Sequence, residues 1–329
     1  MEAPLVAVVG GDSLLAKELR EQLRLSEPAP RIELISSTAD GSSVLGADHD
    51  EPIVMSPLTA VSLAGSRVAF LAGSHASSRR TLKVNPPDGP VLIDLLGALE
   101  EQPEARLRAP QVEPPDGPKP ASPIKVIAHP AAIALAILLS RLAQCGRITR
   151  SLVHVFEPAS ERGQPGLDEL HQQTVAVLAF KKLKMDVFDA QLGFNLLARY
   201  GEEAPVPFQA IELRLERNLA SLLAAHPTIP MPSVRLIQAP VFHGHSFSVW
   251  VEFEDAPNPK EISKSLTAAG IDVRPDDPPT NVGTTGESGL SVGAIGVDRN
   301  QPRACWMWMV ADNLRMTVEN ALAAAKESL

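Results

Sequence analysis

The stretch Lys125–Ser140, KVIAHPAAIALAILLS, decides the fold of this chain. An apolar strand runs into His129 and Pro130, and a nearly uncharged apolar run follows. Proline is favoured at a first helical position, because its φ angle is already helical and it lacks an N–H that would stay unpaired. The stretch therefore predicts a helix that begins abruptly at the carboxyl end of a strand. In α/β proteins such a corner often carries a nucleophile, whereas here it carries Ala131 and Ala132.

Composition and charge narrow the class of protein. The 329 residues provide enough chain for two domains with buried cores. Hydrophobic residues make up 44% and charged residues 21%, as in an ordinary globular protein. The formal charge of −9 argues against a broad nucleic-acid surface, because phosphates attract basic proteins. We therefore expect a globular protein that does not bind nucleic acid.

The apolar segments and the cysteines predict the cellular compartment of the protein. No uninterrupted apolar run reaches the roughly 18 residues that a membrane span needs. The apolar start Leu5–Gly10 is short for a signal peptide and has no basic lead-in. Cys145 and Cys305 lie far apart and have no metal-site or redox spacing. These features predict a cytoplasmic protein with reduced thiols and no membrane contact.

The first strand is followed by a glycine turn. Leu5–Val9 leads into Gly10-Gly11-Asp12-Ser13 and then into an amphipathic helix that reaches about Leu25. This order opens a dinucleotide-binding unit, in which the helix N-terminus faces a pyrophosphate. Of the G-x-x-G-x-x-G spacing only the first glycine is kept, and a side chain at Ser13 would crowd a phosphate. The turn predicts a Rossmann-type fold and leaves nucleotide binding open.

Further short apolar strands continue the rhythm of a doubly wound parallel sheet. The expected strands are 31–36, 54–55, 68–71 and 91–95. The second strand ends in Ser36-Ser37-Thr38-Ala39, which supplies neither the acidic residue typical of an NAD site nor the arginine typical of an NADP site.

Matches in the second half follow one another in the order and spacing of a known family. The matching residues are Ser160, Gly163, Gly166, Glu169 and Leu170, then Gln238–Ser246, Val292–Gly293 with Asp298, and Asp312–Arg315. Together with the corner at His129 and Pro130, these segments make the whole chain resemble the aspartate-semialdehyde dehydrogenases. The resemblance implies NADP-dependent, phosphorylating oxidation of a semialdehyde through a thioacyl intermediate.

The resemblance also assigns catalytic positions. The nucleophilic cysteine of the family falls on Ala132, and the glutamine that orients the intermediate falls on Glu157. The acid/base histidine is retained as His245. The arginine that binds the substrate carboxylate falls on Gln238, which cannot make a charged bidentate clamp.

The resemblance further implies substrate and cofactor contacts. The Glu-x-Lys pair that binds substrate in the family corresponds to Glu212 and Arg214. The cofactor would be NADP or NAD, with contacts at Gly10, Ser13, Leu14, Ser160, Gly163 and Asn313.

The resemblance implies two domains and a homodimer. Residues 1–128 would form the Rossmann-type domain, completed by a C-terminal helix at 312–329. Residues 129–311 would form a catalytic-like α+β domain whose mixed, largely antiparallel sheet makes the dimer. The strands expected in that sheet are 148–156, 174–188, 206–213, 234–253 and 305–311. The alternation of apolar and polar residues in Phe247–Phe253 supports a half-buried strand directly.

Three hypotheses for the function remain. In the first, the chain is a family member that has lost thiol-dependent catalysis and acts as a binding or regulatory homodimer. In the second, it is an enzyme of altered chemistry that uses His245 and Glu157 as acid and base, or one that oxidises a semialdehyde by an unrecognised route. In the third, it is a structural subunit that pairs with an active homologue. Whether the chain is an enzyme stays open at this point.

A metal site is the alternative interpretation of the histidines. His243 and His245 lie on one face of a strand, and with Glu157 or His129 they would resemble part of a zinc site. We predict no metal, because His245 has its own counterpart in the family and His243 is expected at the rim of the cleft.

Overall fold

The computed structural model describes residues 3–38, 44–48, 51–114 and 122–329. The chain divides into two compact units. The first comprises Met1–Ala128 with Thr317–Leu329, and the second comprises His129–Met316. None of the helices within the described residues is long and apolar enough to span a membrane.

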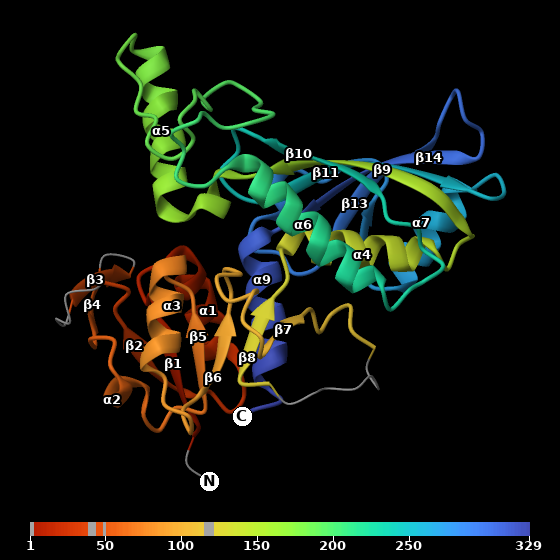
Figure 1. The fold of residues 1–329 in the computed structure, drawn as a ribbon. Coiled ribbons are helices and arrows are strands. Elements are labelled where there is room, and N and C mark those ends of the chain that lie inside the picture. The colour runs from red at the N-terminus through yellow and green to blue at the C-terminus, as the bar shows by residue number, and fades with distance from the viewer. Residues whose placement is uncertain (1–2, 39–43, 49–50, 115–121) are drawn as a thin grey trace. The chain divides into compact units, whose positions relative to one another are not determined.

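The first unit is built on a six-stranded, all-parallel sheet (Figure 1). Its strands, in spatial order, are β2 (Arg31–Ile35), β1 (Leu5–Val9), β5 (Val68–Leu71), β6 (Val91–Asp94), β8 (Ile124–Ile127) and β7 (Ala105–Arg108). Its helices are α1 (Leu14–Leu25), α2 (Ala60–Leu63), α3 (His75–Val84) and the last turns of α9 (Asn313–Ala325). The strands β1 and β5 are apolar and, apart from Leu5, buried, as expected for a parallel sheet with both faces covered.

Two cationic side chains hold the C-terminal segment to this unit. Lys125 on β8 donates from Nζ to the carbonyl of Ala324 at 2.7 Å, and it pairs with Glu327 at 2.9 Å. Arg108 on β7 also pairs with Glu327, at 2.7 Å. The C-terminal helix is thereby held to the last strands of the parallel sheet.

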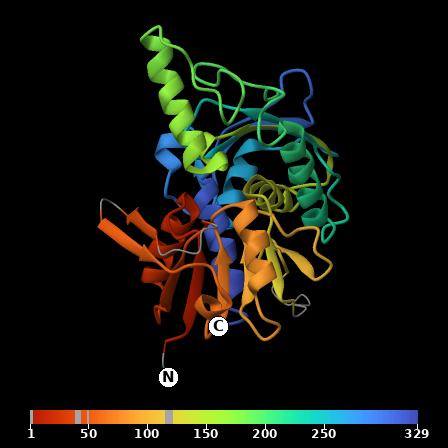
Figure 2. The same cartoon turned by 60° about the vertical axis from the view of Figure 1, so that its left-hand side comes forward.

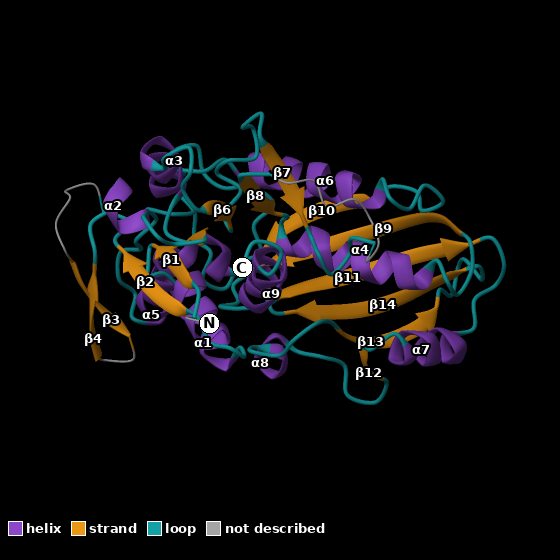
Figure 3. Cartoon of the chain, turned by 90° about the horizontal axis from the view of Figure 1, so that it is seen from below, coloured by secondary structure: helices purple, strands orange, loops and turns teal. Residues whose placement is uncertain are grey.

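The second unit contains a six-stranded mixed sheet (Figure 3). Its strands, in spatial order, are β10 (Ser233–Gln238), β9 (Ile148–Glu157), β11 (His245–Phe253), β14 (Ala304–Ala311), β13 (Ser291–Val297) and β12 (Asp272–Arg274). The central pairs are antiparallel, and the two edge pairs are parallel. The fold class expected from the sequence, a doubly wound parallel sheet plus a mixed, largely antiparallel one, is confirmed.

The helices of the second unit divide into a packed group and an arm. The elements are α4 (Pro130–Leu142), η1 (Ala159–Arg162), α5 (Gly163–Leu178), α6 (Phe208–Leu223), α7 (Pro259–Ala268) and α8 (Asn281–Thr284). α4 and α6 pack against each other beneath the sheet (Figure 1). α5 extends away from the sheet as an arm (Figure 2). Most of α4 is fully buried, as its uncharged sequence predicts.

Two expected strands are wrong, and a third is a strand but lies outside the parallel sheet. Residues 206–213 belong largely to helix α6, because Ile211, Leu215 and Leu219 recur at helical spacing and are buried. Residues 174–178 continue helix α5. Residues 54–55 lie in β4 (Glu51–Met55), which pairs with β3 (Val44–Asp48) in a separate hairpin outside the parallel sheet.

Candidate functional site

The corner after β8 holds a histidine in one orientation. His129 precedes the first turn of α4, and its Nδ1 accepts a hydrogen bond from the backbone N–H of Ala131 at 3.2 Å. Its own backbone N–H donates to Oδ1 of Asn218 on α6 at 2.8 Å. Because Nδ1 uses its lone pair as an acceptor, the neutral ring carries its proton on Nε2.

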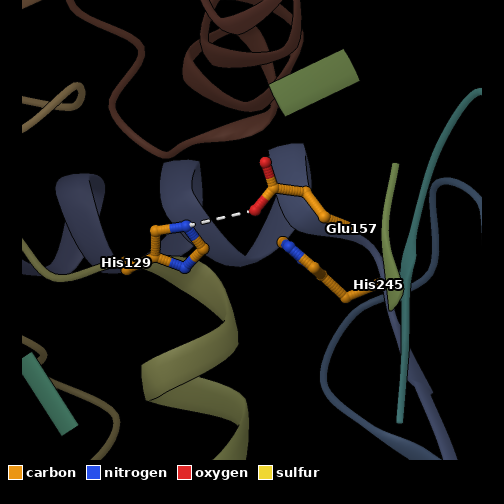
Figure 4. A group of neighbouring side chains, drawn as sticks. All are labelled: His129, Glu157 and His245. Atoms are coloured by element: carbon orange, nitrogen blue, oxygen red, sulfur yellow. Dashed lines mark ion pairs between the residues drawn. The ribbon is translucent and has the colours of Figure 1, made fainter. Parts of the chain in front are cut away.

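Two more side chains converge on this ring (Figure 4). Ser246 pairs with Phe156 between β11 and β9, which brings His245 beside Glu157 at the same end of the sheet. The three side chains, named here the His129 cluster (His129, Glu157 and His245), are each at most 1% exposed. His129 Nε2 lies 3.9 Å from Glu157 Oε2, and the two imidazole rings are 5.6 Å apart between centroids.

The atoms that face one another in the cluster are unsatisfied. Among the described residues, His129 Nε2, Glu157 Oε2 and His245 Nε2 are buried and have no hydrogen-bond partner. A separation of 3.9 Å is too long for a hydrogen bond. Buried polar atoms are normally paired, and an unpaired one costs about 1–3 kcal/mol. Three of them in one place make this corner the candidate binding site.

Charged residues from the segment after β9 surround the cluster. Arg162 donates to Oε1 of Glu157 at 3.1 Å. Oε2 of Glu161 lies 3.9 Å from His129 Nε2, and its other oxygen accepts from Nδ2 of Asn313 at 2.8 Å. Ser160 donates to Oδ1 of Asn313 at 3.2 Å. Two residues expected at a cofactor, Ser160 and Asn313, therefore lie together beside the cluster and support Glu161.

Gly163 has a backbone role here. Its φ angle of +64° lies in the region that favours glycine, at the junction of η1 and α5. The chain turns there immediately after Arg162, so the glycine helps to position the guanidinium that contacts Glu157.

Burial sets the charge states of the cluster. Burial, followed by the charges of Arg214, His245 and Arg162, holds the pKa of His129 well below its ordinary value. Burial also lowers the pKa of His245. For Glu157, burial raises the pKa to about 7 despite the opposing effect of Arg162. The site at neutral pH thus contains two neutral imidazoles and a carboxyl group that titrates.

Gln238 is engaged by the protein itself. Its Nε2 donates to the carbonyl of Glu157 at 2.8 Å and to that of Ala239 at 3.3 Å, and its Oε1 accepts from Tyr200 at 2.5 Å. The side chain is fully buried. In this arrangement it links β10, β9 and Tyr200, and both of its donors are already used.

The structure separates the pair expected to bind substrate. Oε2 of Glu212 accepts the backbone N–H of Leu236 at 2.7 Å and so ties α6 to β10. Arg214 lies two residues further along the helix, where side chains point to nearly opposite sides. Its charge lowers the pKa of His129 and that of Glu157, so Arg214 acts on the cluster whereas Glu212 contacts the sheet.

Neither thiol lies at the corner. Ala132 is fully buried in the first turn of α4, and its backbone N–H donates to the carbonyl of His129 at 2.8 Å. Cys145 is exposed beyond the end of α4, after about 15 Å of helical rise. Cys305 is buried in β14 and pairs with Val251, about 20 Å along β11 from His245. Burial raises its pKa to about 11.

The glycine turn of the first unit is packed and paired. Gly10 has a φ angle of +83°, and a Cβ there would lie 2.2 Å from the Cα of Gly73. Arg20 donates to the carbonyl of Gly11 at 3.0 Å. Oγ of Ser13 caps α1 by accepting from the N–H of Ala16 at 3.1 Å, and Leu14 begins the helix. These residues serve close packing within the unit.

Two features of this turn bear on dinucleotide binding. The side chain of Ser13 occupies one of the helix N–H groups that would face a pyrophosphate. The neighbouring Asp12 is exposed and adds negative charge at the same place.

Some residues of the site were not expected from the sequence. Arg162, Asn218 and Tyr200 act through side-chain contacts with the cluster or with Gln238. Only Arg162 had a local indication, because it directly precedes the glycine that turns the chain. The sequence offered His129 as a third metal ligand, and the structure shows it as a hydrogen-bonded residue that precedes the first turn of α4.

Comparisons with known proteins agree with the fold. Residues 139–316 match the family model described as the semialdehyde dehydrogenase dimerisation domain. A USG-1 protein homolog of Azotobacter vinelandii is 30% identical over 317 residues, which cover 94% of this chain and 93% of that protein. The aspartate-semialdehyde dehydrogenase of Aquifex aeolicus is 26% identical over 94% of this chain and 93% of its own length.

Solved structures give the same result. A probable aspartate-semialdehyde dehydrogenase from Pseudomonas aeruginosa superposes with a TM-score of 0.86 at 26% identity, covering 99% of this chain and 98% of that one. Aspartate semialdehyde dehydrogenase II of Vibrio cholerae, complexed with ASA, has a TM-score of 0.81 at 20% identity, with coverage of 99% and 98%, and shows the shared fold.

Proposed function

This chain belongs to the semialdehyde dehydrogenase family, and we propose that it is a member without the thiol-dependent reaction, which acts as a binding or regulatory homodimer. The observation that carries the proposal is the buried methyl group of Ala132 at the position assigned to the nucleophile. The family reaction begins when a thiolate attacks the aldehyde carbonyl. With Cys145 beyond the far end of α4 and Cys305 buried in β14, no thiol is available for this step.

An assay of the family reaction tests the proposal. Purified protein is supplied with aspartate semialdehyde, phosphate and NADP, and formation of NADPH is followed. We expect no phosphate-dependent turnover, whereas a family member that has the cysteine, assayed in parallel, should react. Robust phosphate-dependent turnover by this chain would end the proposal.

A homodimer is part of the proposal. The family model that matches the second unit is a dimerisation domain. The sheet of this unit also exposes apolar side chains, with Leu152 38% and Trp306 40% exposed. Light scattering should give twice the chain mass of 35.1 kDa. If only self-dimers are recovered, the hypothesis of a structural subunit that pairs with an active homologue loses support. If the protein is a monomer, the proposed homodimer is wrong.

The proposal does not require a bound nucleotide. NADP or NAD is the cofactor that the family implies, but Ser13 and Asp12 fit a pyrophosphate poorly. A thermal-shift screen with NAD, NADP and AMP should show no stabilisation, since a ligand raises folded-state stability only if it binds. We place the protein in the cytoplasm, where Cys145 and Cys305 would stay reduced.

The His129 cluster favours a second candidate function, an enzyme that uses Glu157 and His245 as acid and base. Its support is an unpartnered carboxylate oxygen with a pKa of about 7 next to neutral imidazoles. This hypothesis fails if replacement of His245 by alanine leaves unchanged every activity that substrate screening finds.

A further inference from the structure

The spacing in the His129 cluster distinguishes between two kinds of occupant. One nitrogen of each imidazole and one oxygen of Glu157 lie within 4.8 Å of one another. Two ring nitrogens up to 4.8 Å apart can both lie about 2.8 Å, the length of a hydrogen bond, from one oxygen atom, with the Glu157 oxygen beside it. Zinc bonds of 2.0–2.1 Å would need the three atoms about 3.3 Å apart. The separation of 3.9 Å between His129 Nε2 and Glu157 Oε2 therefore fits an oxygen atom better than a metal ion.

The hydrogen bonds of His129 favour the same occupant. A histidine that binds a metal through one nitrogen normally donates an N–H from the other nitrogen. In His129 the other nitrogen, Nδ1, accepts the N–H of Ala131. Nε2 consequently carries the proton and presents a donor to the cluster, without a lone pair for a metal. Because burial keeps the pKa of this ring low, it remains a neutral donor at pH 7.

We propose that the His129 cluster binds the oxygen of a small carbonyl compound and catalyses proton exchange at the carbon next to the carbonyl. The proposal deepens the second candidate function and does not depend on a thiol. His129 donates from Nε2 to the carbonyl oxygen, and His245 supplies another ring nitrogen beside the same oxygen. The unpartnered Oε2 of Glu157 accepts the proton from the adjacent carbon.

The step is balanced without a cofactor. The C–H bond breaks, its electron pair forms a carbon–carbon double bond, and the carbonyl π electrons move onto the oxygen that His129 holds. The proton resides on Glu157, where it exchanges with solvent, and Glu157 gives a solvent-derived proton back to the carbon when the electrons return. Nothing is oxidised or reduced. A neutral imidazole that polarises a carbonyl and a carboxylate that removes the neighbouring proton form an established combination for this chemistry.

The partners of the surrounding side chains point to a neutral substrate. Both donors of Gln238 bind backbone carbonyls, and Arg162 donates to Glu157. The carboxyl groups of Glu157 and Glu161 each lie 3.9 Å from His129 Nε2 and would repel an anion. Although the charge of Arg214 also reaches the cluster, the two nearby carboxyl groups lead us to assign the site to an uncharged aldehyde or ketone rather than to a carboxylate-bearing semialdehyde.

Deuterium incorporation tests the proposal. The full chain is incubated in D₂O with dihydroxyacetone, propanal or succinate semialdehyde, and proton NMR follows the signals next to the carbonyl. We expect exchange in the two neutral probes and less in the anionic one. Replacement of Glu157 by glutamine should slow it at least about 100-fold, and replacement of His129 by glutamine at least about 10-fold. His154→Gln is the matched control, because His154 lies on the same strand but points away from the cluster, and exchange should persist.

Several outcomes would overturn the proposal. If the wild type exchanges neither neutral probe faster than Glu157→Gln does, the proposed activity is absent. If the wild type exchanges succinate semialdehyde faster than the neutral probes, the assignment to neutral substrates is wrong. Stoichiometric zinc retained after dialysis by the wild type but not by His129→Gln would show a metal site instead. If Glu157→Gln does not fold, as judged by circular dichroism, His129→Gln and His245→Gln carry the comparison. Because the assay contains neither NADP nor phosphate, its failure says nothing about the missing thiol reaction, and NADPH formation would leave the exchange result intact.

Discussion

Two turns of this molecule have the same form and differ in how their polar atoms are satisfied. Each leads from a buried parallel strand into a helix: Gly10–Ser13 after β1, and His129 after β8. At the first turn, Ser13 caps α1 and Arg20 holds the carbonyl of Gly11. At the second turn, the backbone N–H and the Nδ1 of His129 also form hydrogen bonds. Its Nε2 has no partner, and it lies beside two further unpartnered atoms, one on Glu157 and one on His245.

The difference between the turns favours the His129 cluster as the ligand site that we propose. The sequences of both turns resemble sites of known enzymes, so resemblance alone does not say which turn is the better candidate for a ligand site. At the glycine turn, the side chains of Ser13 and Arg20 bond to the backbone of their own unit. The His129 cluster buries polar atoms at a cost that only an additional partner removes.

The largest expected change in stability comes from a substitution in the first turn. Gly10→Ala should lower the free energy of unfolding by about 4 kcal/mol, because the new methyl group would meet the backbone of Gly73 in a left-handed conformation. Urea unfolding measures the change. Gly270→Ala is the matched control: its φ of +81° is similar, but no atom lies within 4 Å of the new Cβ, so only about 1–2 kcal/mol should be lost. Equal losses at the two positions would contradict the close packing of Gly10 on Gly73.

The next largest expected change is in the pH dependence of stability, and it tests Glu157 at the second turn. The folded protein keeps the proton of Glu157 up to a pKa of about 7, whereas the unfolded chain releases it near 4.5. The folded state thus binds more protons between these values, and the stability that this group contributes is lost as the pH rises through about 7. Compared with Glu157→Gln, the wild type should lose about 3 kcal/mol between pH 4.5 and 8.

Denaturant unfolding at several pH values measures this difference. Because Glu157→Gln keeps an oxygen that can accept from Arg162, the remaining contacts of the site are matched. Glu254→Gln, at a side chain that is 56% exposed, should leave the pH dependence of the wild type unchanged. If the free energies of unfolding of the wild type and Glu157→Gln differ by the same amount at every pH, the buried carboxyl group does not have a raised pKa.

The smallest effect concerns the cap of α1. Ser13→Ala should lower stability by about 1 kcal/mol, because the N–H of Ala16 loses its acceptor. Ser13→Asn keeps an accepting oxygen and should cost only a few tenths of a kcal/mol. Thermal melts of the two variants would separate them by a few degrees, and identical melting curves would show that the cap contributes nothing.

Much of the fold could be predicted from the sequence. The strand, proline and apolar run at Lys125–Ser140 gave a helix beginning at Pro130, because each of these features acts locally. The alternation in Phe247–Phe253 gave a strand for the same reason. The strand expected at 206–213 was wrong because an apolar segment that is short suits either state, and the decisive repeat runs beyond it to Leu219.

The site could be predicted only in part. Family resemblance singled out Glu157 and His245 and placed the missing thiol at Ala132, and the roles of these residues stay predictions. The orientation of His129 depends on Asn218, which is 89 residues away in the chain, and the engagement of Gln238 depends on Tyr200. Such contacts form only when distant elements pack together, so no local pattern of residues encodes them.

The unequal exposure of the two cysteines gives the chain a built-in reporter of unfolding. A maleimide dye added to the folded protein should react at Cys145, which is exposed, and should leave Cys305 untouched in the interior of β14. A second adduct, read as a mass increment, would then appear only when the central strands of the mixed sheet open. The rate of that second labelling would follow the opening of one sheet in the native ensemble, without any engineered probe.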